Sequence, residues 1–213
     1  MDIMFNIIST GSKGNAVVIE DRILIDCGVP YYKLNGAIDT LQIVLLTHIH
    51  SDHFNPSTIR RLAYNRPSLR FGCGKWLVRP LIEAGVNPDN IDILIADQWY
   101  GYNGFKVQPI SLVHNVPNQG YKLVLSQGRK LIYATDTNNL NGIEAKNYDL
   151  YLIEANYVDE EIQERIKEKE EQGIYPYEYE VLKNHLSKAK CDDFIVRNSG
   201  PQSSFVYMHC HED

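Results

Sequence analysis

The sequence is poor in cysteine and has no long hydrophobic run, and each absence limits what the protein can be. Its four cysteines lie far apart without a Cys-x-x-Cys pair, which fits a reducing compartment better than a disulfide framework. No apolar run approaches the roughly 20 residues that span a bilayer, and the N-terminus lacks a basic segment followed by an apolar core. We therefore expect a cytoplasmic protein with no membrane partner.

Basic residues are also in deficit, since 21 Lys and Arg stand against 27 Asp and Glu for a formal charge of -6. This balance argues against a surface that neutralises many phosphates of a long nucleic acid, whereas a small anionic substrate is compatible with it. No repeat, low-complexity tract or Pro/Gly-rich linker divides the chain. We expect one domain over residues 1–213.

The motif THIHSDHF is the richest concentration of reactive side chains in the chain. It places His48, His50, Asp52 and His53 within six residues, directly after the short β-branched run at 43–46, which predicts a buried strand. Desolvating three imidazoles and a carboxylate so close together is costly without a partner. Because imidazole nitrogen and carboxylate oxygen are good ligands for zinc and similar ions, the motif predicts a metal site.

Two earlier segments add candidates near this motif. Asp26 ends a predicted strand one structural unit before the motif, so we expect it to orient the ligands by hydrogen bonds rather than to touch the metal. The turn-rich stretch GSKGN contains Ser12 and Asn15, and its backbone and side chains can cradle an anion of a substrate. Hairpin loops have the same composition, so both interpretations stay open.

Short apolar runs and amphipathic stretches predict an α/β protein. The expected helices are 31–40, 56–64, 76–84, 159–172 and 179–196, with His185 near the middle of the last one. The expected strands are 5–9, 16–20, 22–26, 43–46, 69–72, 91–96, 105–110, 121–126, 131–134, 148–154 and 203–208. Two groups of strands, each interleaved with helices, suggest two sheets packed face to face with helices outside.

A hydrolytic two-metal site needs five or six ligating side chains. Beyond the motif, His114, Asp136 and one of the two C-terminal histidines, His209 or His211, follow predicted strands and complete the set. We favour His209 because it comes directly after the last strand. Glu154 ends a strand of buried character, so its carboxylate needs a partner.

These motifs together resemble the metallo-β-lactamase fold. THIHSDH is similar to its His-x-His-x-Asp-His motif, LIDCG to its first motif, and His114, the Asp136 of YATDT and His209 follow in the same order. The chain is most similar to the RNase Z-like group, including small bacterial and phage phosphodiesterases such as the phage anti-Pycsar enzymes. GSKGN, IEAN and NHLS have counterparts there. The resemblance implies a four-layer αββα sandwich of two mixed β-sheets with helices outside.

By motif position, the resemblance also implies a ligand set for two divalent ions, zinc being favoured over manganese or iron. One ion is expected on His48, His50 and His114, and the other on Asp52, His53 and His209, with Asp136 bridging them. Relatives use a late histidine, oriented by a glutamate, to protonate the leaving oxygen, and the matching residues here are His185 and Glu154. With Asp52 they are the predicted catalytic residues.

The expected activity is metal-dependent hydrolysis of a phosphodiester, favouring a small 3′,5′-cyclic nucleotide, as in the phage enzymes that act in the host cytoplasm. A nuclease of RNase Z type acting on RNA or DNA, a thioester or lactone hydrolase, and a protein that sequesters nucleotides without turnover are the alternatives. The sequence stops four residues after His209, where many relatives continue. We expect a homodimer, which is common among relatives and helps complete the pocket.

Overall fold

Twelve strands in residues 2–210, the part of the chain that the computed structural model describes, form two six-stranded sheets. The chain divides into a first unit, which ends at Tyr100, and a second unit, which begins at Gly101, and each unit contains one sheet. Both sheets are mixed, as predicted. The expectation of a single domain stays a prediction. None of the described helices has the length and the apolar composition that crossing a membrane requires.

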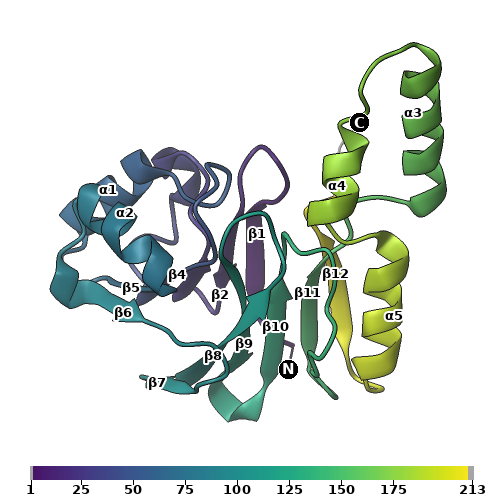
Figure 1. Ribbon diagram of the computed structural model, residues 1–213. Helices are drawn as coiled ribbons and strands as arrows, with labels where there is room; N and C mark the ends of the chain where they lie inside the picture. The colour runs from purple at the N-terminus through teal and green to yellow at the C-terminus, as the bar shows by residue number, and fades with distance from the viewer. Residues whose placement is uncertain (1, 211–213) are drawn as a thin grey trace. The chain divides into compact units, whose positions relative to one another are not determined.

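The first sheet has its strands in chain order (Figure 1). They are β1 (Phe5–Ser9), β2 (Ala16–Ile19), β3 (Ile23–Ile25), β4 (Ile43–Leu46), β5 (Arg70–Cys73) and β6 (Ile91–Ile93). The first three strands pair antiparallel, and β3 to β6 pair parallel. The central strands β3 and β4 are uniform, fully buried apolar runs, as expected where both faces of a parallel sheet are covered, whereas β5 begins with Arg70 and the edge strand β6 contains Asp92.

Helices α1 (Pro56–Asn65) and α2 (Val78–Glu83) belong to the first unit, and Figure 1 draws them together on one side of its sheet. Asn55 caps α1 by accepting a hydrogen bond from the Thr58 amide, and Pro56 occupies the first turn. Single 3-10 turns occupy Tyr31–Leu34, Lys75–Leu77 and Pro88–Asn90. The apolar faces of α1 and α2 join one core with β4 and β5.

The helix predicted over residues 31–40 is wrong, because only Tyr31–Leu34 forms a 3-10 turn. Asn35 has extended backbone angles, and Gly36 follows with a φ of +93°. A left-handed residue this early ends a helix after one turn.

The second sheet also has its strands in chain order. They are β7 (Tyr100–Tyr102), β8 (Phe105–Leu112), β9 (Asn118–Val124), β10 (Lys130–Ala134), β11 (Leu150–Glu154) and β12 (Ser204–Met208). Strands β8, β9 and β10 pair antiparallel, whereas β10, β11 and β12 pair parallel. Since the carboxyl ends of β10, β11 and β12 meet at one edge of the sheet, residues that follow them come close together.

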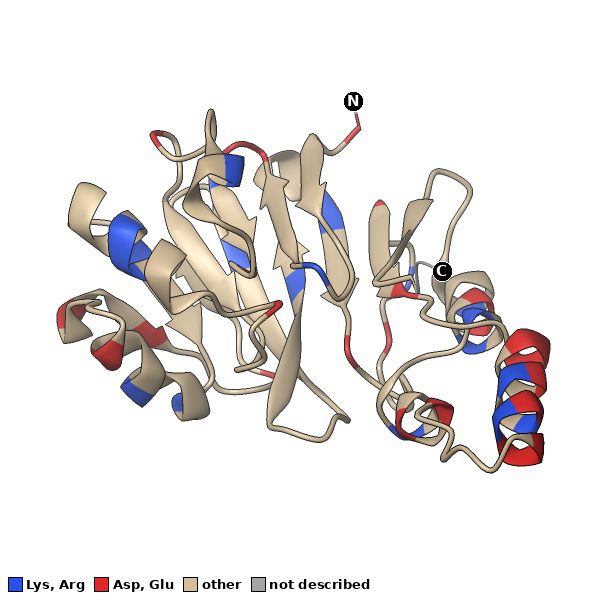
Figure 2. Cartoon of the chain, turned by 90° about the horizontal axis from the view of Figure 1, so that it is seen from above, with Lys and Arg blue, Asp and Glu red and all other residues tan. Residues whose placement is uncertain are grey.

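Helices α3 (Asp159–Glu171), α4 (Glu178–Asn184) and α5 (Lys188–Asn198) belong to the second unit, together with a 3-10 turn at Ser126–Gly128. Helix α5 packs on the sheet through Phe194 and Ile195, which share a core with Tyr151 and Ile153. Helices α3 and α4 extend past the sheet as an arm (Figure 1). Acidic and basic residues alternate along α3 in Figure 2, and most of its residues are exposed.

The single helix predicted over residues 179–196 is wrong, since α4 ends at Asn184 and α5 begins at Lys188. His185 has extended backbone angles, with φ of −127° and ψ of 160°. Ser187 caps α5 with its hydroxyl and pairs with Tyr157 as an isolated β-bridge. The break takes His185 out of a helix and places it in a connecting segment.

Candidate functional site

The first half of the candidate site lies at the ends of the parallel strands β3 and β4. Asp26 follows β3, is fully buried and has a left-handed φ of 59°. Its Oδ1 accepts hydrogen bonds from the backbone amide of Thr47 at 3.0 Å and from the Thr47 hydroxyl at 2.9 Å. A buried carboxylate with these donors is a fixed anchor for the motif loop. Sequence reasoning missed the part that Thr47 plays.

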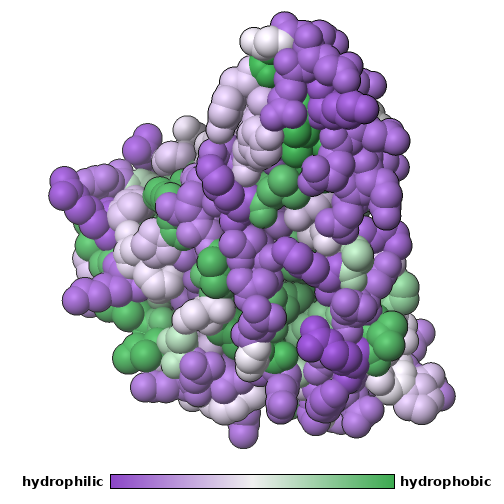
Figure 3. Space-filling view, turned by 45° about the vertical axis from the view of Figure 1, so that its right-hand side comes forward, coloured by the Kyte–Doolittle hydropathy of each residue, from purple (hydrophilic) through white to green (hydrophobic). Residues whose placement is uncertain are grey.

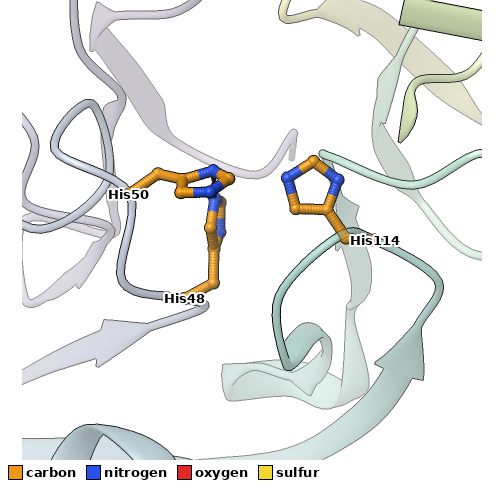
Figure 4. Close-up of side chains that lie close together, drawn as sticks. All are labelled: His48, His50 and His114. Carbon is orange, nitrogen blue, oxygen red and sulfur yellow. Dashed lines mark hydrogen bonds between the residues drawn. The ribbon is translucent and has the colours of Figure 1, made fainter. Parts of the chain in front are cut away.

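The ring of His48 is oriented by this anchor. Its Nδ1 lies 3.0 Å from the Thr47 hydroxyl, which itself donates to Asp26. The consistent assignment has His48 donate its Nδ1 proton to that hydroxyl, which leaves Nε2 with a lone pair. This Nε2 lies 3.1 Å from Nδ1 of His50, and the two rings meet edge to face. Figure 4 draws both rings on the loop after β4.

His53 is held from both ring nitrogens. Its Nδ1 donates to Oδ2 of Asp26 at 2.7 Å, and its Nε2 accepts from the Asn15 amide at 2.8 Å. The same Nε2 lies 3.5 Å from Oδ2 of Asp52. Asn15 is fully buried and its amide is oriented by both backbone groups of Gly11. It therefore fixes the GSKGN loop against the motif.

Ser12, in contrast, lies exposed on that loop. Substrate contact by Ser12 and Asn15 stays a prediction.

The motif loop leaves no room for a side chain at Gly28. A Cβ on this glycine would lie 1.8 Å from the carbonyl oxygen of Asp52. The backbone amides of Asn15 and Cys27 also bind this loop, at the carbonyls of Asp52 and His53, at 2.6 Å and 2.9 Å. Gly28 is thus a further residue that positions the motif, and the sequence signals it only as the glycine of LIDCG.

The second half of the candidate site lies at the ends of β10, β11 and β12. Glu154 is the last residue of β11, Asp136 comes two residues after β10, and His209 directly follows β12. Asp136 and His209 both take left-handed backbone angles, with φ of 58° and 50°. Non-glycine residues in this conformation are strained and concentrate at functional sites. Ligand atoms of Asp136, Glu154, His185 and His209 lie within 4.8 Å of one another.

Glu154 and His185 form the pair that the sequence predicted. Oε1 of the fully buried Glu154 lies 2.6 Å from Nδ1 of His185, and Oε2 accepts from the backbone amide of Thr137 at 2.9 Å. The carboxylate therefore holds the proton of His185 on Nδ1. The His185 side chain is 16% exposed, which leaves the imidazole open to a ligand.

His114 comes from the loop after β8. Its Nδ1 donates to the carbonyl oxygen of Asn184 at 3.0 Å, and its Nε2 lies 3.9 Å from Oδ1 of Asp136. His209 is buried, and its Nδ1 lies 3.9 Å from Oδ1 of Asp136 and 3.4 Å from Oε1 of Glu154. His211 lies outside the described residues, so the choice between it and His209 stays a prediction.

The donor set of the two halves fits divalent metal ions. His48, His53 and His114 each give one ring N–H to an oxygen acceptor, and the other nitrogen points away from it. This is the arrangement by which proteins orient metal-binding imidazoles. Buried imidazoles and carboxylates at these spacings otherwise carry the cost of desolvation without the gain of a bound cation.

Comparisons with known proteins agree with this chemistry. The model of the beta-lactamase superfamily domain matches residues 21–175. None of the curated proteins searched matches the sequence.

Solved structures share the fold at low identity. The metallo-beta-lactamase fold protein YhfI from Bacillus subtilis is 16% identical, with a TM-score of 0.74 over 98% of this chain and 87% of its own. The short form of human tRNase Z is 17% identical, with a TM-score of 0.69 over 100% of this chain and 93% of its own. A long-form RNase Z from yeast is 11% identical, with a TM-score of 0.69 over 100% of this chain and 38% of its own. The predicted fold class, an αββα metallo-β-lactamase fold, is thereby confirmed.

Proposed function

We propose, from the premise that this chain belongs to the beta-lactamase superfamily and is a metal-dependent hydrolase, that it hydrolyses phosphodiester bonds. The observation that carries the proposal is the pair of Glu154 and His185, joined at 2.6 Å with the carboxylate fully buried. An alkoxide leaving from phosphorus is a poor leaving group and needs a proton. Thioesters and lactones have less need of such an acid, so the pair favours phosphodiesters.

Two divalent ions would be held by the side chains that the sequence motifs indicate. His48, His50 and His114 would hold one ion, and Asp52, His53 and His209 the other, with Asp136 shared between them. Such ions supply a hydroxide near neutral pH and neutralise charge on the phosphoryl oxygens. The support within each unit is the hydrogen bonding that orients His48, His53 and His114. Zinc is the proposed metal, because the donors are mostly imidazole nitrogens.

The residues of the chain itself account for the proton. Protonated His185 has its Nδ1 proton committed to Glu154, so Nε2 is the position from which a proton reaches the leaving oxygen. The backbone amide of Thr137 donates to the other oxygen of the Glu154 carboxylate, so a fixed carboxylate orients the His185 ring.

We assign a small 3′,5′-cyclic nucleotide as the substrate. The formal charge of -6 supports this choice, because a long polyanion is repelled by an acidic protein. The second candidate is cleavage of RNA, which the fold shared with human and yeast RNase Z enzymes favours.

The two candidates separate in one assay. Metal-loaded protein is incubated with cyclic AMP, CMP and UMP and with labelled single-stranded oligonucleotides, and products are resolved by chromatography. Linear monophosphates from the cyclic nucleotides are expected, and cleavage of oligonucleotides alone would replace the cyclic-nucleotide assignment with the nuclease one.

The variant Asp136→Ala distinguishes hydrolysis from sequestration of nucleotides without turnover. This variant should lose turnover, whereas unchanged removal of nucleotide from solution would indicate a binding protein. We also propose a homodimer, and light scattering of a fully active monomer would contradict it.

A further inference from the structure

The base of the arm contains a cleft that the proposed chemistry does not use. Two cavities of about 160 Å³ each lie there, and both are lined by Asn156, Tyr157 and Arg165. We call the two together the α3 cleft. Because they share these three lining residues, the cavities are neighbours, and Arg165 of α3 contributes to both.

The outer cavity adjoins the second half of the candidate site. Asn156 lines it and donates its side-chain amide to the carbonyl oxygen of His209 at 2.9 Å. Cys210, the residue after His209, also lines this cavity, as does Lys188. The outer cavity therefore borders the chain segment that carries His209. The two cations Arg165 and Lys188 face one carboxylate there, that of Glu161, which suits a phosphate or a ribose.

The inner cavity combines apolar walls with one carboxylate. Tyr157, Ile162 and Val181 supply the walls, and Tyr177 of the arm stands 67% exposed at its margin. In Figure 3 a strip of apolar surface runs down the arm between hydrophilic surfaces. Aromatic and aliphatic walls of this kind stack against the flat face of a nucleobase.

Glu178 is the polar group of the inner cavity, and it is only 9% exposed. One carboxylate oxygen, Oε1, accepts a hydrogen bond from Nζ of Lys169 at 2.6 Å. The other, Oε2, is buried without a hydrogen-bond partner among the described residues. A buried acceptor without a donor costs free energy, and a ligand N–H recovers it.

The charge state of Glu178 suits this role. Burial raises the pKa of its carboxyl, but hydrogen bonds from Lys169 and from the backbone of Glu178 itself, together with the charges of Lys169 and Arg165, outweigh burial and hold the pKa below its ordinary value. The group is therefore an anion at neutral pH and can only accept hydrogen bonds.

We infer that the α3 cleft binds the nucleobase of the substrate and that Oε2 of Glu178 accepts a hydrogen bond from an exocyclic amine. Cytosine, adenine and guanine carry such an amine on the Watson–Crick edge, and carboxylates read the amine of cytosine in other nucleic-acid complexes. Uracil has a carbonyl oxygen where cytosine has its amine, so it is disfavoured at this position. The inference rests on the proposed function for the nature of the ligand, but it concerns binding, which is measured without turnover.

The test is calorimetric titration of the protein with cytidine and uridine 5′-monophosphate. Wild-type protein should bind the cytidine nucleotide about tenfold more tightly, since a hydrogen bond to a charged group is worth about this factor. Glu178→Gln can turn its amide N–H₂ toward the base, so the preference should fall to about threefold or less or be reversed. Glu171→Gln makes the same change at an exposed residue of α3 and should leave the preference intact.

A second variant guards against local unfolding in the first. Val181→Phe fills the inner cavity with apolar atoms and should weaken binding of both nucleotides at an unchanged melting temperature. Equal affinity of wild-type protein for both nucleotides, or an unchanged preference in Glu178→Gln, would overturn the inference. Base-selective binding without hydrolysis of any phosphodiester would instead refute the proposed function and leave the α3 cleft as a nucleotide site.

Discussion

Replacing Glu154 by Gln isolates the proton-donating step of the proposed reaction. The carboxylate now accepts from both His185 and the Thr137 amide, at 2.6 Å and 2.9 Å. Glutamine has one side-chain oxygen. Because the backbone amide of Thr137 can only donate, whereas the imidazole of His185 can change tautomer, the oxygen should stay with Thr137. The N–H₂ group then faces Nδ1 of His185 and forces the imidazole into the tautomer with its proton on Nε2.

The size of the effect follows from the lost interaction. A hydrogen bond between a buried carboxylate and an imidazole is worth about 1.5–3 kcal/mol, and 1.4 kcal/mol is tenfold in rate. Turnover of a phosphodiester with a nucleoside leaving group should therefore fall by roughly 10- to 150-fold, which reaches only the lower end of the usual contribution of a general acid, about 10²- to 10⁴-fold.

The assay compares two leaving groups. A p-nitrophenolate leaves without protonation, so hydrolysis of bis(p-nitrophenyl) phosphate should fall by about threefold or less in Glu154→Gln. Glu144→Gln, at an exposed residue, is the matched control and should leave both rates unchanged. Because Oε1 of Glu154 also lies 3.4 Å from Nδ1 of His209, metal content is measured in each variant. An equal loss on both substrates at full metal content would refute the acid role.

Three further perturbations test the remaining parts of the structure. Gly28→Ala places a Cβ 1.8 Å from the carbonyl oxygen of Asp52, so it should lower both the urea midpoint of unfolding and the metal affinity. Gly101→Ala is the control, because its Cβ meets nothing within 4 Å, and it should change neither quantity. Iodoacetamide at pH 7.5 should modify the exposed Cys210 of the folded protein and spare the buried Cys73. Burial raises the pKa of the Cys73 thiol to about 12, which leaves almost no thiolate to react. Equal labelling of the two cysteines would contradict this expectation. Chelator dialysis should lower the melting temperature, since a metal bound only by the folded state at 100 times its Kd stabilises it by about 2.7 kcal/mol, and an unchanged melting temperature after verified metal loss would count against the proposed sites.

Local sequence patterns were sufficient for the elements that carry the first half of the site. The run 43–46 is the strand β4, and the motif after it supplies His48, His50, Asp52 and His53 at a strand end. Asp26 likewise directly follows β3, at the end of the strand that the sequence predicted there. Such strand ends are predictable because short apolar runs must be buried and the polar residues that follow them are then confined to one edge of the sheet.

Tertiary structure alone decided how these side chains are oriented. The bond from His185 to Glu154 spans 31 residues, and the helix predicted through His185 gave way to an extended segment that makes this bond possible. Asn15 likewise became a buried partner of His53, 38 residues away. Hydrogen bonds between such distant positions leave no periodicity in the sequence.

The sequence by itself therefore determined the fold family, the strands and the kinds of donor atoms, because these depend on local hydrophobic patterns and on motif spacing. The three-dimensional fold decided which imidazole nitrogen of His48 stays available, the extended backbone that brings His185 to Glu154, and that Glu178 keeps one buried oxygen in the α3 cleft. The physical reason is that a buried polar group takes its role from the partner it meets on folding, and that partner is set by packing rather than by neighbours in the chain.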